Sequence, residues 1–310
     1  MTTTYEKIIA KLNLGKEKKL LVVHQDDIGM CHGANKAFKE LSSYGFVNCG
    51  ALMVPCPWSL ETLEMCKSDV KLDIGIHLTL TSEYNFYKWR PNSGPNSDTG
   101  LVDKNGFFWS TVPEVEKNAS QDSVEKELRM QIELVLNSGI NVSHMDCHMG
   151  TALSPKFQDI YLKLCKEYNI PGIFPRSYSK FNLAAQANEI KNKGLDATID
   201  AEENVHQKKV ENLEMNENML VFDHFAMSPF AKKGENTKLI KDILSNLNVG
   251  LTYLALHPNA PGEIEIIDPE QWHIRTEEYS LFKDKEFLDW VKTIENLHCI
   301  SMREIKSLIF

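Results

Sequence analysis

Short β-rich runs alternate with amphipathic helical stretches from residue 18 to the end of the chain. The stretches 33–43 and 60–67 repeat apolar residues at helical spacing, between apolar runs that have the composition of buried strands. This alternation is typical of repeated β-α units around a mainly parallel sheet, and it predicts one barrel-like α/β domain over residues 1–310. The predicted strands are KLLVVHQ, residues 46–54, residues 72–80, VSHMDC, GIFPRS, MLVFDHF, LTYLALHP and HCISM.

One segment, residues 83 to about 119, interrupts the alternation. It is rich in Asn, Ser, Gly and Pro and follows directly on the strand predicted at 72–80. A long insertion after such a strand can form a lid over a site. An excursion with its own small apolar cluster is an equally good interpretation, and the two are compatible. The aromatic residues of the segment are Tyr84, Phe86, Tyr87, Trp89, Phe107, Phe108 and Trp109.

Composition and charge exclude several classes of function. The 310 residues carry a formal net charge of −9, so no basic excess exists to neutralise nucleic-acid phosphates. No run approaches the roughly 18 apolar residues of a membrane span, and the amino end lacks the pattern of a secretory signal. The seven cysteines are scattered and form no CxxC pair. We therefore expect a reduced, cytoplasmic protein that binds neither nucleic acid nor membrane.

Polar residues that can perform chemistry fall where the predicted strands end. In a parallel α/β fold the carboxyl ends of the strands meet on one side, so side chains at these ends can form a single site. The residues concerned are Asp26 and Asp27 after the first strand, His77 after the third, His144, Asp146 and His148 in SHMDCHMG, Arg176 after GIFPRS and His257 in LTYLALHP.

Each of these residues also has a structural interpretation. The acid pair can bind a metal ion and activate water, or Asp can cap the following helix. A lone histidine such as His77 is more often a hydrogen-bonded core residue than a ligand. In contrast, His144, Asp146 and His148 recur with the period of two that places side chains on one face of a strand. One carboxylate and two imidazoles make a three-ligand set with open positions, as catalytic metal sites require.

The runs HQDDIGMCHGANKAF, LDIGIHLTL, SHMDCHMG and LALHPN resemble the YdjC-like carbohydrate deacetylases in order and spacing. The resemblance implies a distorted (β/α) TIM-like barrel of the polysaccharide deacetylase type. It implies Asp27, His77 and His148 as ligands of one divalent ion, magnesium or zinc, with Asp26 as general base and His257 as general acid. The implied substrate is an N-acetylated sugar or oligosaccharide, and a homodimer is expected.

Some positions depart from the family or lie outside its triad. The family often has Phe at Ile28 and further histidines in place of 149–151, and these departures concern substrate choice. Arg176 can orient Asp26, touch substrate or be an exposed loop residue, and Asp146 is a further candidate for orienting or substrate contact. Five further histidines, which we expect to be structural or solvated, are His24, His32, His206, His273 and His298.

The sequence thus predicts a metal-dependent hydrolase that removes an acetyl group from an N-acetylated sugar. Two other classes stay open. A facial-triad iron oxygenase also uses two histidines and one carboxylate, although such enzymes usually have an all-β fold. A catalytically idle sugar-binding protein on the same scaffold would use the aromatic insertion to stack on sugar rings.

Overall fold

The computed structural model describes residues 2–177, 203–216 and 219–310. Its strands are β1 (Lys19–Ile28), β2 (Cys49–Leu52), β3 (Ile74–Leu78), β4 (Val142–Cys147), β5 (Gly172–Pro175), β6 (Met219–Phe222), β7 (His224–Met227), β8 (Gly250–Leu256) and β9 (Leu297–Cys299). Its helices are α1 (Thr4–Lys11), α2 (His32–Tyr44), α3 (Ser59–Ser68), η1 (Ser97–Thr99), α4 (Val112–Asn118), α5 (Gln121–Asn137), η2 (His148–Leu153), α6 (Gln158–Glu167), α8 (Glu203–Asn216), α9 (Asn236–Ser245), α10 (Ile264–Ile267), α11 (Trp272–Leu281), α12 (Lys285–Val291) and α13 (Met302–Ile309).

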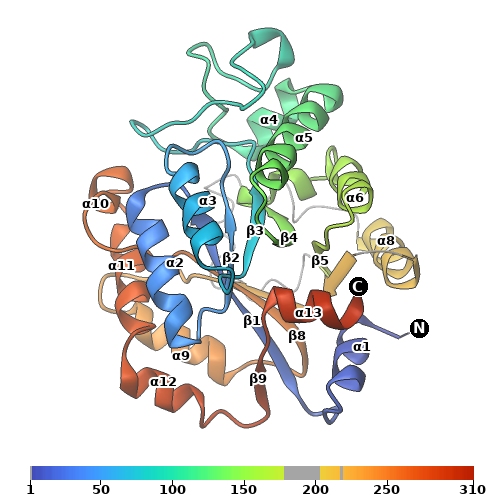
Figure 1. Ribbon diagram of the computed structural model, residues 1–310, viewed down its shortest axis with the longest axis vertical. Coiled ribbons are helices and arrows are strands. Elements are labelled where there is room, and N and C mark those ends of the chain that lie inside the picture. The colour runs from blue at the N-terminus through green and yellow to red at the C-terminus, as the bar shows by residue number, and fades with distance from the viewer. Residues whose placement is uncertain (1, 178–202, 217–218) are drawn as a thin grey trace.

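All pairs of strands in the sheet are parallel, and their order is β6-β5-β4-β3-β2-β1-β8-β7 (Figure 1). β1 also pairs with a strand outside this order: its first residues pair with β9, while its last residues pair with β2. The sheet curves into a nearly closed barrel whose end strand β6 also contacts β8. The predicted α/β fold, a distorted TIM-like barrel, is therefore confirmed.

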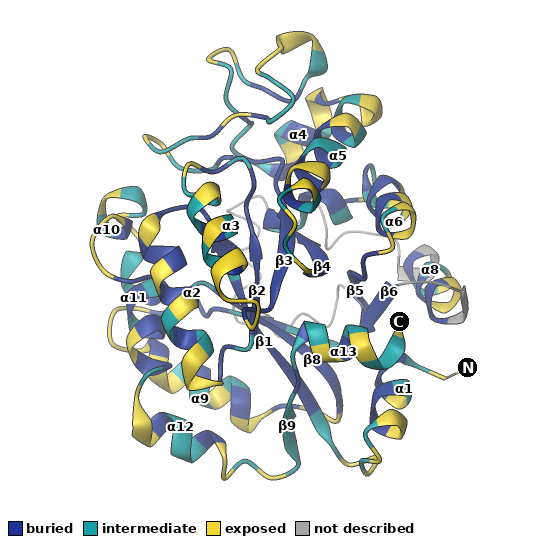
Figure 2. Ribbon diagram, viewed as in Figure 1, coloured by how far each residue is buried: buried dark blue, intermediate teal, exposed yellow. Residues whose placement is uncertain are grey.

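The core follows from the apolar runs that predicted the strands. Residues of β1 from Leu20 to Val23 are fully buried, and successive residues pack into different clusters: Leu21 with Leu41 of α2, and Leu20 with Ile8 of α1. Complete burial of one such side chain stabilises the fold by about 1.5–3 kcal/mol. Figure 2 shows the result, with buried strands inside and helices exposed on their outer faces.

The run predicted as a single strand in MLVFDHF forms two strands, β6 and β7, which Asp223 separates. The Asp223 carboxylate accepts hydrogen bonds from the backbone N–H of Leu251 (2.9 Å) and from Arg176 Nε (2.7 Å). The backbone N–H of Asp223 donates to the Leu251 carbonyl (2.9 Å), so backbone and side chain together hold Asp223 against β8 at the point where the chain leaves β6 and begins to pair with β8.

Residues 83–119 leave the barrel after β3 and form the loops at the top of Figure 1. Glu127 of α5 fixes this segment, accepting hydrogen bonds from the backbone N–H groups of Asn92 (2.9 Å) and Ser93 (2.8 Å). Trp89 and Phe108 are buried and pack into the main core, so these aromatic residues of the segment join the barrel core rather than a small cluster of their own.

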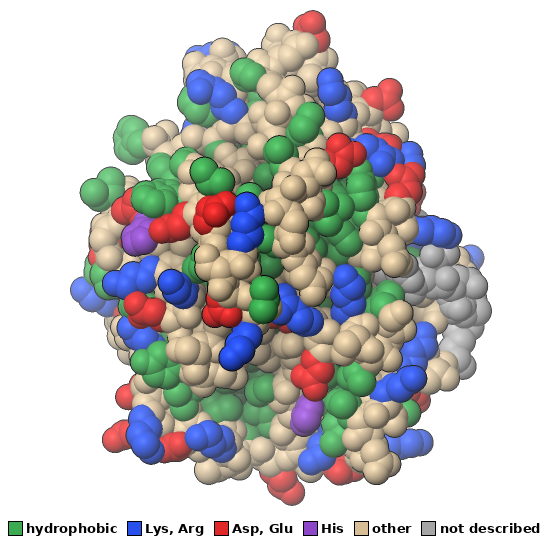
Figure 3. All heavy atoms as spheres, in the orientation of Figure 1, with side chains coloured by type: hydrophobic (Ala, Val, Ile, Leu, Met, Phe, Trp, Pro, Cys, Tyr) green, Lys and Arg blue, Asp and Glu red, His purple; other side chains and the backbone are tan. Residues whose placement is uncertain are grey.

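The surface carries mixed charge. On the face shown in Figure 3, Lys and Arg side chains are interspersed with Asp and Glu, without a continuous basic region on that face. Within the described ranges, no helix combines the length and the apolar composition needed to cross a membrane.

Candidate metal centre and catalytic cavity

The carboxyl ends of the strands open into a cavity of about 530 Å³. Asp26 and Asp27 reach it from β1, His77 from β3 and His148 from the start of η2. Asp146 of β4 and His257, which follows β8, also line it. Six of the eight strand-end residues that the sequence indicated thus line the cavity, whereas His144 and Arg176 are not among its described lining residues.

Asp27 reaches the cavity through an irregular backbone. The register between β1 and β2 shifts between Gln25 and Ile28, and Asp27 lies in the left-handed region with φ 60°. A residue other than glycine adopts this conformation at a cost of roughly 1–2 kcal/mol. Met149, directly after His148, has φ 52°. Such outliers concentrate at functional sites, because the surrounding fold must hold them in place.

Asp27, His77 and His148 form what we call the outer cluster, and their ligand atoms lie within 4.8 Å of one another. Asp27 Oδ1 lies 3.1 Å from His148 Nδ1 and 3.7 Å from His77 Nε2. The other nitrogen of each imidazole is held by a carboxylate, His77 Nδ1 by Asp146 (2.8 Å) and His148 Nε2 by Glu83 (3.0 Å). These contacts orient both rings, as carboxylate partners do for metal-binding histidines.

The outer cluster fits a divalent ion. Asp27 Oδ1 is buried and accepts no hydrogen bond from the described residues, although an unpaired buried carboxylate oxygen is costly. With an ion bound, Nδ1–H of His77 and Nε2–H of His148 would be donated to Asp146 and Glu83, and the other ring nitrogens would offer their lone pairs to the ion beside this oxygen. Two imidazoles and one carboxylate are a ligand set that leaves positions for water and substrate.

The charges around the outer cluster favour a cation. Burial lowers the pKa of His148, but Glu83 and Asp27 outweigh it and raise the pKa to about 10. Burial also opposes ionisation of Asp27, yet Arg275 and then His148 hold the pKa of that carboxyl well below its usual range. The negative charge that raises the histidine pKa would equally attract a metal ion, which displaces protons from its ligands.

Asp26 and His257 lie beside the outer cluster. Asp26 Oδ2 is 4.0 Å from His77 Nε2 and 3.8 Å from His257 Nε2. His257 is fixed from behind, since its Nδ1 lies 3.0 Å from Ser228 Oγ and its backbone N–H donates to Glu278 Oε2 at 2.8 Å. Burial lowers the pKa of the His257 imidazole. The site therefore holds a carboxylate and an imidazole that can exchange protons with a molecule in the cavity.

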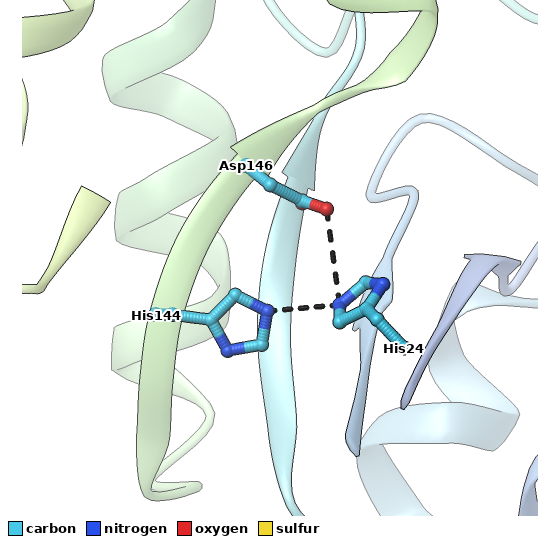
Figure 4. Close-up of side chains that lie close together, drawn as sticks. All are labelled: His24, His144 and Asp146. Carbon is cyan, nitrogen blue, oxygen red and sulfur yellow. Dashed lines mark hydrogen bonds and ion pairs between the residues drawn. The ribbon is translucent and has the colours of Figure 1, made fainter. Parts of the chain in front are cut away.

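His24, His144 and Asp146 form a second group, which we call the inner cluster (Figure 4). His24 Nε2 lies 2.9 Å from His144 Nε2, and His24 Nδ1 lies 2.6 Å from Asp26 Oδ1. Ser143 Oγ lies 2.8 Å from His144 Nδ1, so every ring nitrogen of these two histidines has a hydrogen-bonding partner.

The inner cluster corrects one expectation. His144, Asp146 and His148 do not form one ligand set, because β4 ends at Cys147 and the turn that follows carries His148 away to Asp27. Asp146 instead contacts His77 and accepts a hydrogen bond from Tyr253 (2.9 Å), contacts that would orient rather than ligate. His24, which we expected to be structural or solvated, is fully buried and contacts the predicted general base Asp26 directly.

Two arginines lie near the strand ends: Arg176, which the sequence offered as a candidate, and Arg275, which it did not. Arg176 is paired with Asp223 (2.7 Å) and Glu214 (2.6 Å) and is not among the described residues that line the cavity, so its role toward Asp26 or substrate stays a prediction. Arg275 of α11 donates to Asp27 Oδ2 at 2.8 Å. The sequence reasoning missed Arg275 because it lies within a helix, where no strand-end position marks it.

Fold and site together define a class: a parallel α/β barrel with a candidate divalent-metal centre at the carboxyl ends of its strands. The chain belongs to the YdjC-like protein family, whose model matches residues 20–293.

Proteins named carbohydrate deacetylase are among its relatives. The protein from Thermus thermophilus is 32% identical over 171 residues, which cover 55% of this chain and 58% of that protein. The protein from Thermoanaerobacter pseudethanolicus is 24% identical over 275 residues, covering 88% and 94% of the two chains. The alignment with the Thermus protein thus spans less than two thirds of that relative, whereas the second alignment spans nearly all of its relative.

A solved structure shares the fold. The crystal structure of an Enterococcus faecalis protein, provisionally described as a cellobiose-phosphate cleavage protein, superposes with a TM-score of 0.68. It covers 92% of this chain and 98% of that chain at 19% sequence identity. At this identity the likeness supports the barrel architecture alone.

Proposed function

We propose that this protein is a carbohydrate deacetylase, a metal-dependent hydrolase that cleaves the amide bond of an N-acetylated sugar or oligosaccharide. The observation that carries the proposal is the buried Asp27 Oδ1, which faces the nitrogens of His77 and His148 without a hydrogen-bond donor from the described residues. The relatives named carbohydrate deacetylase support it. The parallel α/β barrel counts against the iron oxygenase alternative, whose enzymes usually have an all-β fold.

Asp27, His77 and His148 would hold one divalent ion, zinc or magnesium. A bound ion of this kind polarises a carbonyl oxygen and lowers the pKa of a bound water molecule. Two imidazole nitrogens suit zinc, whereas magnesium prefers oxygen ligands. We therefore expect zinc to bind this set more tightly than magnesium.

Asp26 acts as the general base and His257 as the general acid in this proposal. Asp26 takes a proton from the attacking water, and the departing amine must receive a proton before the C–N bond can break. Asp26 Oδ2 and His257 Nε2 lie 3.8 Å apart, too far for a direct hydrogen bond, so a proton from the base reaches the leaving group through a water molecule or the reacting groups between them. Because burial lowers its pKa, His257 gives up a bound proton readily.

The cavity wall suits a sugar that carries no phosphate. Phe86, from the insertion, is 99% exposed and lines the cavity, where its ring can stack on a sugar face. Arg275 is the one Lys or Arg among the described lining residues, and Asp27 and Tyr84 already accept its hydrogen bonds. The lining also includes Glu83, Asp268 and Glu270, which would repel an anionic group.

The insertion at 83–119 acts as a substrate-access segment within a single domain of residues 1–310. Its Glu83, Tyr84, Asn85 and Phe86 line the cavity, and Glu83 also contacts His148. A homodimer and a cytoplasmic location stay expectations from the sequence.

An acetate-release screen tests the proposal. Acetylated mono- and oligosaccharides, each with and without a phosphate group, are supplied with zinc, magnesium, manganese and cobalt in separate arms. We expect release from a neutral N-acetylated sugar, strongest with zinc. Tight oligosaccharide binding by calorimetry with no acetate release in any arm would instead favour the idle sugar-binding alternative.

A further inference from the structure

His24 connects the proposed general base to the inside of the barrel. Its Nδ1 lies 2.6 Å from Asp26 Oδ1, and its Nε2 lies 2.9 Å from His144 Nε2. His144 Nδ1 in turn lies 2.8 Å from Ser143 Oγ. A continuous series of hydrogen bonds therefore runs from Ser143 through two imidazoles to Asp26, and Figure 4 shows its central contact.

The chemistry of the groups limits the direction of these bonds. Each short contact between two ring nitrogens or between a ring nitrogen and an oxygen needs one proton, and a neutral imidazole has one N–H. If the Ser143 hydroxyl donates to His144 Nδ1, then His144 Nε2–H donates to His24 Nε2. His24 must then carry its proton on Nδ1 and donate it to Asp26 Oδ1. Each of these three contacts then has one proton, and neither imidazole is charged.

The opposite direction requires a buried charge or a protonated Asp26. Ser143 Oγ also lies 3.1 Å from the carbonyl oxygen of Ile74, a second acceptor for the hydroxyl proton. If the hydroxyl donated there, His144 would donate to Ser143 and His24 would donate to His144. His24 could then face Asp26 only as an imidazolium or with a proton on the carboxyl. A charged His24 would lie 2.6 Å from Asp26 and 3.8 Å from Asp146, whereas the full burial of both rings disfavours a charge.

The surroundings fix the rings of this series. A methyl group at Gly75 would lie only 2.5 Å from the His144 ring, so the ring fits against β3 only because this residue has no side chain. Tyr253 lies against His24 with ring centroids 5.0 Å apart. Burial, together with the neighbouring His24, lowers the pKa of His144 to about 3, so this ring is neutral at physiological pH.

We propose that Ser143 and His144 fix the tautomer of His24, and that His24 is a positioning residue that holds Asp26 as a base through Oδ1. The inference rests on the proposed function for its catalytic meaning. With Oδ1 held by His24, Asp26 Oδ2 faces the cavity, 3.8 Å from His257 Nε2. Asp26 thereby has Oδ2 available to accept the proton of the attacking water, and the contact with His24 prevents the carboxylate from rotating away from the cavity.

The tautomers can be measured without any assay of activity. In ¹⁵N-histidine-labelled wild-type protein, long-range ¹H–¹⁵N spectra distinguish protonated from bare ring nitrogens. We expect His24 to carry hydrogen on Nδ1 alone and His144 on Nε2 alone. Hydrogen on His24 Nε2 would overturn the proposal, whether or not the protein proves to be a deacetylase.

Three variants test the role in turnover. His24→Asn places an amide nitrogen where Nδ1 was and can still donate to Asp26, whereas His24→Leu cannot. We expect His24→Leu to lower kcat on the order of 10²-fold with KM and zinc content unchanged, as misplacement of a catalytic group does. His24→Asn should recover most of that loss, and Ser143→Ala, a small change that spares both rings, should show a smaller loss.

Two results would contradict the positioning role. One is a kcat for His24→Leu equal to that of the wild type. The other is a loss of zinc and activity in proportion, which would make His24 a structural support of the outer cluster. If no variant and no wild-type sample released acetate, the proposed function would fail while the spectra still decided the tautomer.

Discussion

The outer and inner clusters contain the same kinds of side chain, two histidines and one aspartate, yet they differ in how their lone pairs are used. In the inner cluster, each ring nitrogen of His24 and His144 faces a hydrogen-bonding partner, and Asp146 has partners on both oxygens. In the outer cluster, Asp27 Oδ1 and two ring nitrogens face one another, and that oxygen accepts no hydrogen bond from the part of the chain that the structure describes.

This difference shows that residue type and proximity do not define a metal site. Both clusters have ligand atoms within 4.8 Å of one another. A group whose lone pairs are already engaged gains little from an ion, because binding would break the existing hydrogen bonds. A group whose unpaired ligand atoms converge on one point is stabilised directly by a cation. We therefore assign the ion to the outer cluster and a positioning role to the inner one.

The largest expected effect separates the clusters by metal content. Asp27→Ala should lose most bound metal and all measurable activity, because only two imidazoles would remain as protein ligands. His144→Gln, the matched change in the inner cluster, should keep the metal. Mass spectrometry of the metal, beside acetate release, measures both variants. A His144→Gln protein that lost its metal while Asp27→Ala kept it would reverse the assignment.

Asp26 should be needed for turnover alone. Asp26→Asn should retain the metal and bind substrate, yet lose rate by roughly 10²–10⁴-fold, the usual contribution of a general base. Metal analysis and calorimetry with a substrate establish binding, and acetate release gives the rate. Asn also keeps an oxygen that can accept from His24, which makes it the conservative choice. A fully active Asp26→Asn protein would show that the base is another group.

The inner cluster should reveal itself in the pH dependence of stability. In the unfolded chain His144 titrates near 6.5, whereas burial and His24 lower its folded pKa to about 3. The neutral ring therefore contributes stability that is present above pH 6.5 and is lost as the pH falls toward 3. At pH 5 the loss amounts to about 2 kcal/mol.

Urea denaturation of wild type and His144→Gln at pH 7 and pH 5 measures this contribution. The wild type should lose about 2 kcal/mol more unfolding free energy between the two pH values than the variant does. Other titrating groups, including those of the outer cluster, are common to both proteins and cancel in the comparison. Equal losses would mean that His144 is not held neutral in the fold.

The fold could be predicted from sequence because its signal is local. Apolar runs such as residues 72–80 and helical spacing at 33–43 appear in the structure as β3 and α2, with ends shifted by one or two residues. The division of MLVFDHF into β6 and β7 was not predicted, since it depends on contacts of Asp223 with Leu251 and Arg176, which are distant in sequence.

The sequence predicted those residues of the site that lie at the ends of strands. Asp26, Asp27, His77 and His257 reach the cavity because parallel strands end on one side. The period-two argument failed for His148 because periodicity holds only inside a regular strand, and β4 ends one residue earlier. The sequence did not reveal three further contacts, because each joins residues that no local spacing relates. They are made by Arg275 of a helix, Glu83 of a loop and the ring nitrogens of the buried His24.

The smallest effect is expected from a change at Phe86, at the edge of the cavity, because this residue belongs to neither cluster. Phe86 is almost fully exposed at the cavity, whereas Tyr44, on α2, is a half-exposed aromatic residue outside it. If Phe86 stacks on a sugar ring, Phe86→Ala should remove roughly 0.5–1.5 kcal/mol of binding and raise KM about 2- to 10-fold. Its kcat and metal content should not change, because the side chain belongs to neither cluster.

Tyr44→Ala should leave KM, kcat and metal content as in the wild type. Steady-state acetate release on the best oligosaccharide, compared with the matching monosaccharide, measures the effect. The increase in KM should be larger for the oligosaccharide, since a longer substrate reaches further toward the rim. An unchanged KM of Phe86→Ala for both substrates would show that Phe86 does not bind sugar. A lower metal content in Phe86→Ala would show instead that the insertion supports the outer cluster through Glu83, whose carboxylate lies 3.0 Å from His148 Nε2.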